Sequence, residues 1–216
     1  MPTEVCKLCF KEKTDKSVNS ALKTHYSLCF KCFERLVPTF KSFKIDGIKA
    51  IAIYEYDDEL KSLIFQYKGC YDYELRECFL ERYKNELRLR FFDYVLFPIP
   101  SCKEDDQIRG FNHVYEAFKI LNLKMDTRIV KTKKIKQSDR TAKERKNIGE
   151  FLSLIDKSSL KNKKILLVDD ICTTGSTLRA CIKLLEPLNP KRIEVLVLCK
   201  TKDIWHIGKT NNNKLY

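Results

Sequence analysis

Two adjacent aspartates followed by a hydroxyl-rich loop form the segment of this sequence best suited to chemistry. Asp169 and Asp170 come directly after the apolar run at residues 165–168, and five small residues follow closely: Thr173, Thr174, Gly175, Ser176 and Thr177. Hydroxyls and the free backbone amides at the start of a helix bind phosphate groups. Neighbouring carboxylates suit the vicinal hydroxyls of a sugar, directly or through a hydrated Mg²⁺. The segment therefore predicts a site for a ribose 5-phosphate unit.

Each of these features also has an ordinary structural explanation. The two aspartates could simply end a strand, and Ser176 or Thr177 could be the N-cap of a helix without a ligand. The presence of both features in one short run favours the ligand site.

The elements around this segment must bring it to the edge of a sheet. The run at 165–168 is typical of a strand buried on both faces, and Leu178, Ile182, Leu184 and Leu185 recur at helical spacing after it. Further strands are predicted at 48–54, 94–100 and 128–131, and helices at 57–67, 74–89 and 111–121. Alternating strands and helices predict an α/β fold with a doubly wound parallel sheet. Ligands lie beyond the carboxyl ends of such strands, so Pro98, Pro100 and Ser101 should face the same crevice as the aspartates.

Four of the ten cysteines form two pairs, Cys6-x-x-Cys9 and Cys29-x-x-Cys32, separated by 19 residues. This spacing predicts a structural zinc site, because two such turns supply a tetrahedral set of four thiolates. Two redox dithiols, or His25 in place of one sulfur, are the alternatives. The other six cysteines are scattered and are expected to be reduced thiols: Cys70, Cys78, Cys102, Cys172, Cys181 and Cys199.

The chain of 216 residues carries a formal net charge of +13, to which 31 lysines and 11 arginines contribute. Residues 131–146 hold eight basic residues against two acidic ones. Such a segment could follow a nucleic-acid backbone, with Phe111, Tyr115 and Phe151 available to stack on unpaired bases. It could equally be a solvated surface, or meet a pyrophosphate. The sequence has neither an 18-residue apolar run nor a secretory signal, so a cytoplasmic protein without membrane insertion is expected.

Several further motifs occur in a fixed order before the aspartates: Pro98-Ile99-Pro100, Arg109-Gly110-Phe111-Asn112, Gln137-Ser138-Asp139-Arg140 and Arg145-Lys146-Asn147. The aspartates and their loop resemble the phosphoribosyl pyrophosphate signature of type I phosphoribosyltransferases. The whole order resembles ComF proteins, in which a zinc knuckle precedes a phosphoribosyltransferase core. One departure is His113, where that family usually has glutamine.

The resemblance implies a role for each matching residue. Asp169 and Asp170 would bind the ribose hydroxyls or a Mg²⁺ bound to them, and residues 173–177 would hold the 5-phosphate. Candidates for the pyrophosphate or for a mobile lid are Pro100, Ser101, Arg109, Gln137, Arg140 and Arg145. For Arg109, a salt bridge that ties down its loop is an equal alternative. A lone histidine such as His113 is more often structural than a general base.

The resemblance also implies a function. ComF proteins are associated with natural competence and handle single-stranded DNA at the cytoplasmic side of the uptake machinery. We therefore expect a protein that handles incoming single-stranded DNA, binds phosphoribosyl pyrophosphate, and meets other competence proteins, in part at the inner face of the membrane. The alternative is an active phosphoribosyltransferase with an unidentified acceptor, for which Thr173 disfavours purine salvage because purine-salvage relatives carry an aspartate there. A regulator that responds to the same ligand is a third reading.

The expected organisation is a small zinc-binding module followed by one larger domain. The predicted ranges are 1–44 for the four-cysteine module, 45–202 for the domain that resembles type I phosphoribosyltransferases, and 203–216 for a polar tail.

Overall fold

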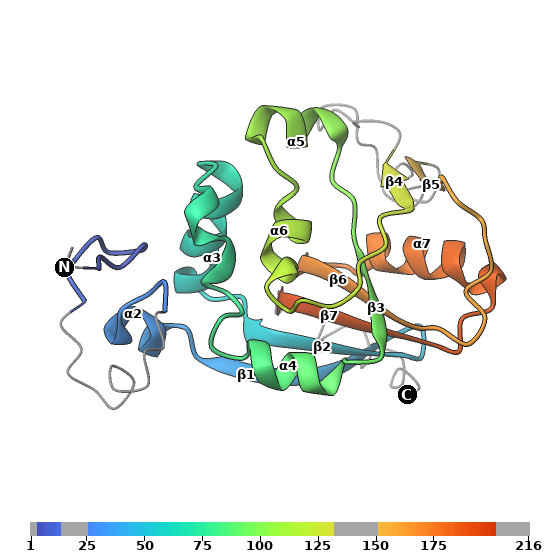
Figure 1. Cartoon of the computed structure of the whole chain (residues 1–216), viewed down its shortest axis with the longest axis horizontal. Coiled ribbons are helices and arrows are strands. Elements are labelled where there is room, and N and C mark those ends of the chain that lie inside the picture. Colours follow the sequence, from blue (N-terminus) through green and yellow to red (C-terminus); the bar gives the residue numbers. More distant parts are fainter. Residues whose placement is uncertain (1–3, 14–25, 132–150, 202–216) are drawn as a thin grey trace, which may run out of the picture.

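A five-stranded sheet forms the centre of the molecule (Figure 1). The computed structural model describes residues 4–13, 26–131 and 151–201. The strand order is β1-β2-β7-β6-β3, and the last four of these strands are parallel. Their bounds are β1 Pro38–Ile45, β2 Ile48–Glu55, β3 Tyr94–Pro98, β6 Lys164–Cys172 and β7 Arg192–Lys200. The predicted parallel sheet is confirmed, with the antiparallel β1 added at one edge.

The central strand β6 is buried because it pairs on both sides, with β7 and with β3. Residues 165–168 are fully shielded from solvent. Leu166 and Val168 belong to the apolar core on one face of the sheet, whereas Ile165 and Leu167 belong to the core on the other. This alternation is the two-residue period of a strand. The predicted buried strand is confirmed, but it continues past Val168 to Cys172.

Helices cover both faces of the sheet, as a doubly wound architecture requires (Figure 1). The core on one face includes residues of α3, α4 and α6, and the core on the other includes residues of α7. The helix bounds are α2 Phe30–Arg35, α3 Asp58–Ile64, α4 Lys84–Arg90, α5 Lys103–Arg109, α6 His113–Lys119 and α7 Ser176–Leu185. Helix α5 has no buried residue and stands away from the sheet (Figure 1). The short strands β4 Ile129–Lys131 and β5 Leu152–Leu154 form a separate antiparallel pair.

Two expectations from the sequence differ from the structure. The helix predicted at 74–89 is a short 3₁₀ turn, Tyr73–Glu77, followed by α4. The cause is the segment between them, in which four consecutive residues are buried, so that no single helical face carries the apolar side chains: Cys78, Phe79, Leu80 and Glu81. In addition, β1 lies mostly within the range predicted for the zinc module, yet it pairs with β2 of the main sheet.

No helix in the described ranges is long and apolar enough to cross a lipid bilayer.

Candidate functional site

The two aspartates lie near the carboxyl end of β6 and point to opposite faces of the sheet. Asp170 contacts α6 and the segment that follows α3. Asp169 pairs in register with Val197 of β7, and its charge adds to burial in raising the pKa of the Cys181 thiol in α7. The strand period explains this separation. The two side chains therefore leave the strand on different sides and have different packing partners, but the carboxylates still interact, because a side-chain contact with Asp170 contributes to the raised pKa of Asp169.

Asp170 is buried and held by two donors from distant parts of the chain. Its Oδ2 lies 2.7 Å from Lys68 Nζ and 3.1 Å from His113 Nε2. Burial alone would raise the pKa of this carboxyl, but the hydrogen bond from His113 and the charge of Lys68 outweigh it and hold the pKa well below its usual value. Asp170 is thus an ionised carboxylate whose charge the protein itself compensates.

His113 is fixed in one protonation state by its surroundings. Its Nδ1 lies 3.2 Å from Arg109 Nη1, which only donates, so Nδ1 accepts and Nε2 carries the proton that is donated to Asp170. Burial lowers the pKa of His113, in agreement with a neutral ring. Arg109 Nε also donates to the backbone oxygen of Lys68 at 3.2 Å. Because both ring nitrogens are engaged, His113 positions Asp170 and is not placed to act as a free base.

Asp169 has a different electrostatic environment. It is partly exposed, and its Oδ1 accepts from the backbone amide of Asp170 at 2.9 Å. Burial and then the neighbouring charge of Asp170 raise its pKa well above the usual value. No cationic side chain among the described residues pairs with it. A cation such as Mg²⁺ would relieve this charge, and Mg²⁺ commonly binds through one or two carboxylates plus substrate oxygens.

The hydroxyl-rich loop opens α7, as predicted. Thr173 and Thr174 are exposed, and Gly175 adopts φ +73°, the left-handed conformation that favours glycine. Thr174 Oγ1 and Ser176 Oγ lie 2.7 Å apart, and Arg179 Nη1 donates to the Thr174 carbonyl at 2.7 Å. Helix α7 has ten residues, so the amides of its first turn and its dipole present a partial positive charge to this loop.

The segment after β3 is tied by side-chain bonds to the start of α6. Ser101 Oγ donates to Asp106, and Asn112 Nδ2 donates to Ser101 Oγ at 3.2 Å and to Asp106 Oδ2 at 2.9 Å. Arg109 Nη1 bonds Asp106 Oδ1 at 3.0 Å, and its side chain is 7% exposed. The loop-fixing salt bridge expected as one alternative for Arg109 is present. Its contact with a pyrophosphate stays a prediction.

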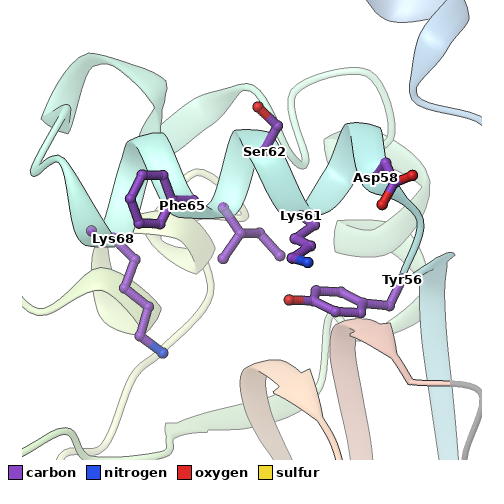
Figure 2. Close-up of a pocket in the computed structure, with 8 residues that line it drawn as sticks. Tyr56, Asp58, Lys61, Ser62, Phe65 and Lys68 are labelled. Carbon is purple, nitrogen blue, oxygen red and sulfur yellow. The ribbon is translucent and has the colours of Figure 1, made fainter.

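One residue of this network, Lys68, has no recognisable sequence signal. It lies 102 positions before Asp170 and projects from the turn that follows α3 (Figure 2). Asp106 was likewise not predicted. Among the predicted site residues, the structure groups Ser101 with Arg109 and places Asp169, Asp170 and the loop at the β6–α7 connection. Gln137, Arg140, Arg145 and the alternative ligand His25 lie outside the described residues.

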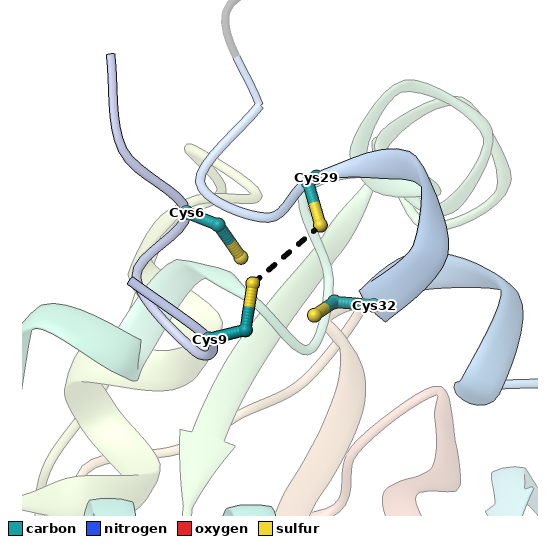
Figure 3. Close-up of side chains that lie close together, drawn as sticks. All are labelled: Cys6, Cys9, Cys29 and Cys32. Atoms are coloured by element: carbon teal, nitrogen blue, oxygen red, sulfur yellow. Dashed lines mark hydrogen bonds between the residues drawn. The ribbon is translucent and has the colours of Figure 1, made fainter. Parts of the chain in front are cut away.

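The four predicted cysteines converge at the N-terminal end of the molecule (Figure 3). Their sulfurs all lie within 4.8 Å of one another, and Cys9 Sγ and Cys29 Sγ are 3.8 Å apart. Four Zn–S bonds of about 2.3 Å in a tetrahedron separate the sulfurs by about 3.8 Å, so the donor set fits a zinc ion. Burial raises the pKa of the Cys6 thiol, but backbone amides of Cys29, Cys9 and Leu8 prevail and lower it to about 7.

This cluster is packed against the main core. Cys6 and Cys32 are buried in the same apolar cluster as residues of α3 and α6. The buried carboxylate of Glu81 accepts the backbone amide of Ser27 with both oxygens at 2.8 Å. The cysteine cluster therefore has a fixed position on the larger domain.

Comparisons with known proteins agree with this geometry. The family model described as "Phosphoribosyl transferase domain" matches residues 109–205. Competence protein ComFC of Streptococcus pneumoniae is 30% identical over 155 residues, which cover 71% of this chain and 69% of that protein. Competence protein ComFC of Bacillus subtilis is 29% identical over 129 residues, covering 59% of this chain and 53% of that protein. A solved hypoxanthine phosphoribosyltransferase from Staphylococcus aureus has a TM-score of 0.40 at 17% identity, covering 59% of this chain and 64% of that one, too low to support an inference.

The sheet, the acidic end of β6 and the loop that opens α7 define a domain of the type I phosphoribosyltransferase class, preceded by a four-cysteine cluster. The similarity to the two ComFC proteins identifies the family within this class. The chain belongs to the ComFC family of competence proteins, as its ordered motifs suggested.

Proposed function

We propose that this protein binds phosphoribosyl pyrophosphate with Mg²⁺ at the β6–α7 connection and handles incoming single-stranded DNA in natural transformation. The observation that carries the proposal is the exposed hydroxyl loop at the start of α7, directly after the two aspartates, in a chain of the ComFC family.

Different parts of the ligand would contact groups of different charge. The 5-phosphate would accept from the hydroxyls and amides of residues 173–177. Asp169 would hold the ribose hydroxyls or Mg²⁺, because among the described residues the nearby Lys68 forms its ion pair with Asp170 and not with Asp169. Mg²⁺, when bound, would neutralise pyrophosphate charge. Asp170, already fixed by Lys68 and His113, would receive a ribose hydroxyl in a preset orientation.

The pyrophosphate would lie near the segment after β3. Pro100 and Ser101 border it, and Arg109 would serve as an oxyanion contact only by exchanging its bond to Asp106. Gln137, Arg140 and Arg145 lie outside the described residues and stay candidates for a lid.

The DNA-handling part of the proposal is supported by family membership and by the net charge of +13. Cations on the surface would displace counterions from the DNA backbone, which makes such binding steeply dependent on salt. We also propose that zinc fills the four-cysteine cluster, that the protein acts in the cytoplasm, and that other competence proteins bring it to the inner face of the membrane.

The decisive experiment is a calorimetric titration with phosphoribosyl pyrophosphate and Mg²⁺. Wild type is compared with Asp169→Asn, which removes one charge at constant shape, and with Glu186→Gln as a matched control. Glu186 is exposed beyond the end of α7 and makes no ion pair in the described part of the chain. We expect binding to wild type and control, and a loss of about tenfold or more in Asp169→Asn. Equal affinities in all three would refute the proposed site.

A second titration tests the DNA part. Affinity for a fluorescent single-stranded oligonucleotide is measured between low and moderate salt, with an expected linear fall of log K against log salt. The absence of measurable affinity at low salt would refute DNA handling while leaving the ligand site intact.

Active phosphoribosyl transfer to an unidentified acceptor is the second candidate, favoured by the match to a transferase domain. Release of pyrophosphate that depends on a defined small acceptor, and not on DNA, would support it. Release of pyrophosphate by hydrolysis, without an acceptor, would not support this candidate.

A further inference from the structure

The cysteine cluster contains the same four-residue run twice, Leu-Cys-Phe-Lys, at residues 8–11 and 28–31. The cysteine sulfurs of the two runs are 3.8 Å apart, so the runs lie close together. In each run the leucine packs against the main core, whereas the phenylalanine is exposed, at 72% for Phe10 and 51% for Phe30. The cluster therefore presents two aromatic rings, each one residue away from a sulfur.

The backbone at Phe10 has a conformation that disfavours an aromatic side chain. Its φ is +57°, in the left-handed region that bulky residues rarely adopt. Its ring also gains little from burial, unlike that of Phe33, which is buried and packs edge-on against Tyr26. Neither backbone preference nor packing accounts for a phenylalanine here, and strained residues are concentrated at binding and active sites. The Phe10 ring is thus placed for contact with a partner.

A lysine follows each exposed ring directly in the sequence. Lys7 of the same cluster pairs with Glu74 at 2.8 Å. In contrast, Lys11 and Lys31 are exposed and form no ion pair with another residue of the described ranges. The surface therefore offers two rings and two cations, each ring beside a cation in the chain.

We propose that these two Phe–Lys pairs, Phe10 with Lys11 and Phe30 with Lys31, form a contact surface for single-stranded nucleic acid. Aromatic rings stack on unpaired bases of any sequence, and lysines contact the phosphates of the backbone. A repeated ring and cation match a polymer whose repeating unit is a base and a phosphate. The inference rests on the DNA-handling part of the proposed function, and it assigns this part to the cysteine cluster and not to the β6–α7 connection.

The test measures the fluorescence anisotropy of a labelled oligothymidylate, and of an abasic strand of the same length, titrated with the full-length chain. We expect wild type to bind the strand with bases at least tenfold more tightly. Phe10→Gly and Phe30→Ala should each weaken that strand by about fivefold to tenfold and leave the abasic strand unchanged. Phe92→Ala, which removes an equally exposed ring outside the cluster, should match wild type.

Phe10→Gly separates binding from folding, because glycine adopts a positive φ without strain. Its metal content and thermal unfolding midpoint should equal or exceed those of wild type. A second variant, Lys11→Met with Lys31→Met, keeps both rings and tests the cations. The slope of log K against log salt should fall by about 1.4, since each phosphate contact on a single strand contributes about 0.7. Lys183→Met, at an exposed lysine of α7, should leave the slope unchanged.

Unchanged DNA affinity in both ring variants, or equal wild-type affinity for the two strands, would overturn the proposal. Vesicles of phosphatidylcholine and phosphatidylglycerol provide a second probe. If the ring variants lose vesicle binding but keep DNA affinity, the surface belongs to a lipid partner and the proposal is refuted. If wild type binds neither strand, DNA handling itself fails together with this surface. If wild type binds and the ring variants bind equally well, only the surface assignment fails.

Discussion

The cysteine cluster and the acidic end of β6 both gather groups that can carry negative charge, but they are held together differently. Asp170 has cationic and hydrogen-bonding partners supplied by the chain, Lys68 at 2.7 Å and His113 at 3.1 Å. The four sulfurs of the cluster, in contrast, lie close to one another, and Cys9 Sγ and Cys29 Sγ are 3.8 Å apart. Four thiolates at such distances would repel one another, and the zinc ion that we propose for this cluster would offset that repulsion.

If zinc fills the cluster as we propose, the acidic site is assembled by the fold alone, whereas the cysteine cluster is completed by a bound ion. The packing of α6 and of the turn after α3 brings His113 and Lys68 to Asp170, so this network forms without a ligand. The cysteines come from two short turns with little regular structure beyond α2. We therefore expect the two regions to respond in opposite ways to metal removal and to single substitutions.

Removal of zinc should have the largest effect. Zinc binding by thiolate sites contributes about 10–16 kcal/mol at neutral pH, which is more than a small module can replace by packing. Chelation or Cys29→Ser should therefore unfold residues 4–13 and 26–36, while the sheet persists. Hydrogen exchange measured segment by segment checks this, together with a metal analysis that finds one zinc per chain.

Cys70→Ser is the matched control for that experiment, because Cys70 is exposed and outside the cluster. It should retain zinc and wild-type exchange. A freshly purified protein without zinc, or a chelated protein whose N-terminal segments stay protected, would show that the cluster does not depend on metal.

Substitution of the aspartates should come next, with unequal effects. Asp170→Ala leaves Lys68 and His113 without their acceptor, and breaking a buried ion pair costs about 3–5 kcal/mol, reduced here because Lys68 is partly exposed. We expect a loss of about 2–3 kcal/mol in urea unfolding. Asp169→Asn removes a charge that the fold disfavours, so it should be neutral or stabilise by up to about 1 kcal/mol. Equal losses would contradict the distinction drawn between the two carboxylates.

His113 offers a finer test of the same network. His113→Ala removes the donor to Asp170 and leaves a cavity, so the free energy of unfolding should fall by about 2 kcal/mol. His113→Gln keeps an amide donor and should cost about half as much. If glutamine were as harmful as alanine, the ring itself and not the hydrogen bond would be what the site requires.

Parts of both regions could be predicted because their signals are local. The cysteine spacing, the apolar run before Asp169 and the helical spacing after Ser176 each lie within a few residues. The partners of Asp170 could not be predicted, since Lys68 is 102 positions away and nothing in its neighbours marks it. Their proximity results from how α3 and α6 pack on one face of the sheet.

The errors in the predicted elements have a related cause. β6 was expected to end at Val168 because aspartates follow, yet pairing with β7 continues to Cys172 and overrides the polarity of the side chains. The helix predicted at 74–89 is interrupted where four consecutive residues are buried, and one of them is Glu81, whose carboxylate accepts the amide of Ser27. In both cases tertiary contacts outweighed the local pattern.

The Asp126–Arg128 pair, which belongs to neither region, provides a reference for an ion pair that the fold alone maintains. Arg128 Nη2 and Asp126 Oδ2 are 2.6 Å apart, with side chains 8% and 18% exposed. Burial opposes ionisation of Asp126, but the hydrogen bonds from Arg128 outweigh it and lower its pKa below the ordinary 3.8. Asp126→Asn should therefore cost about 2 kcal/mol at pH 7.

The pH dependence of that cost follows from the sign of the shift. A lowered pKa means that the contribution is fully present above pH 3.8 and is lost as the pH falls through the folded-state value. The stability difference between wild type and Asp126→Asn should shrink below pH 3.8, measured by urea unfolding at several pH values. A difference that is constant down to pH 2 would mean that packing, not charge, is what the substitution removes.

The smallest expected effect concerns the loop at the start of α7. There, the effect of the backbone conformation on stability can be measured separately from the effect of side-chain contacts. At Gly175, φ is +73°, and an added Cβ would meet its nearest atoms no closer than 3.7 Å. Gly175→Ala is therefore strained only through the left-handed backbone, and we expect a loss of about 1 kcal/mol in unfolding free energy. Gly47→Ala, also at positive φ with open space around it, is the control and should lose a similar amount. If the proposed phosphate contacts are made by this loop, only Gly175→Ala should also weaken phosphoribosyl pyrophosphate, because only there does a shift of the backbone move the amides of the site.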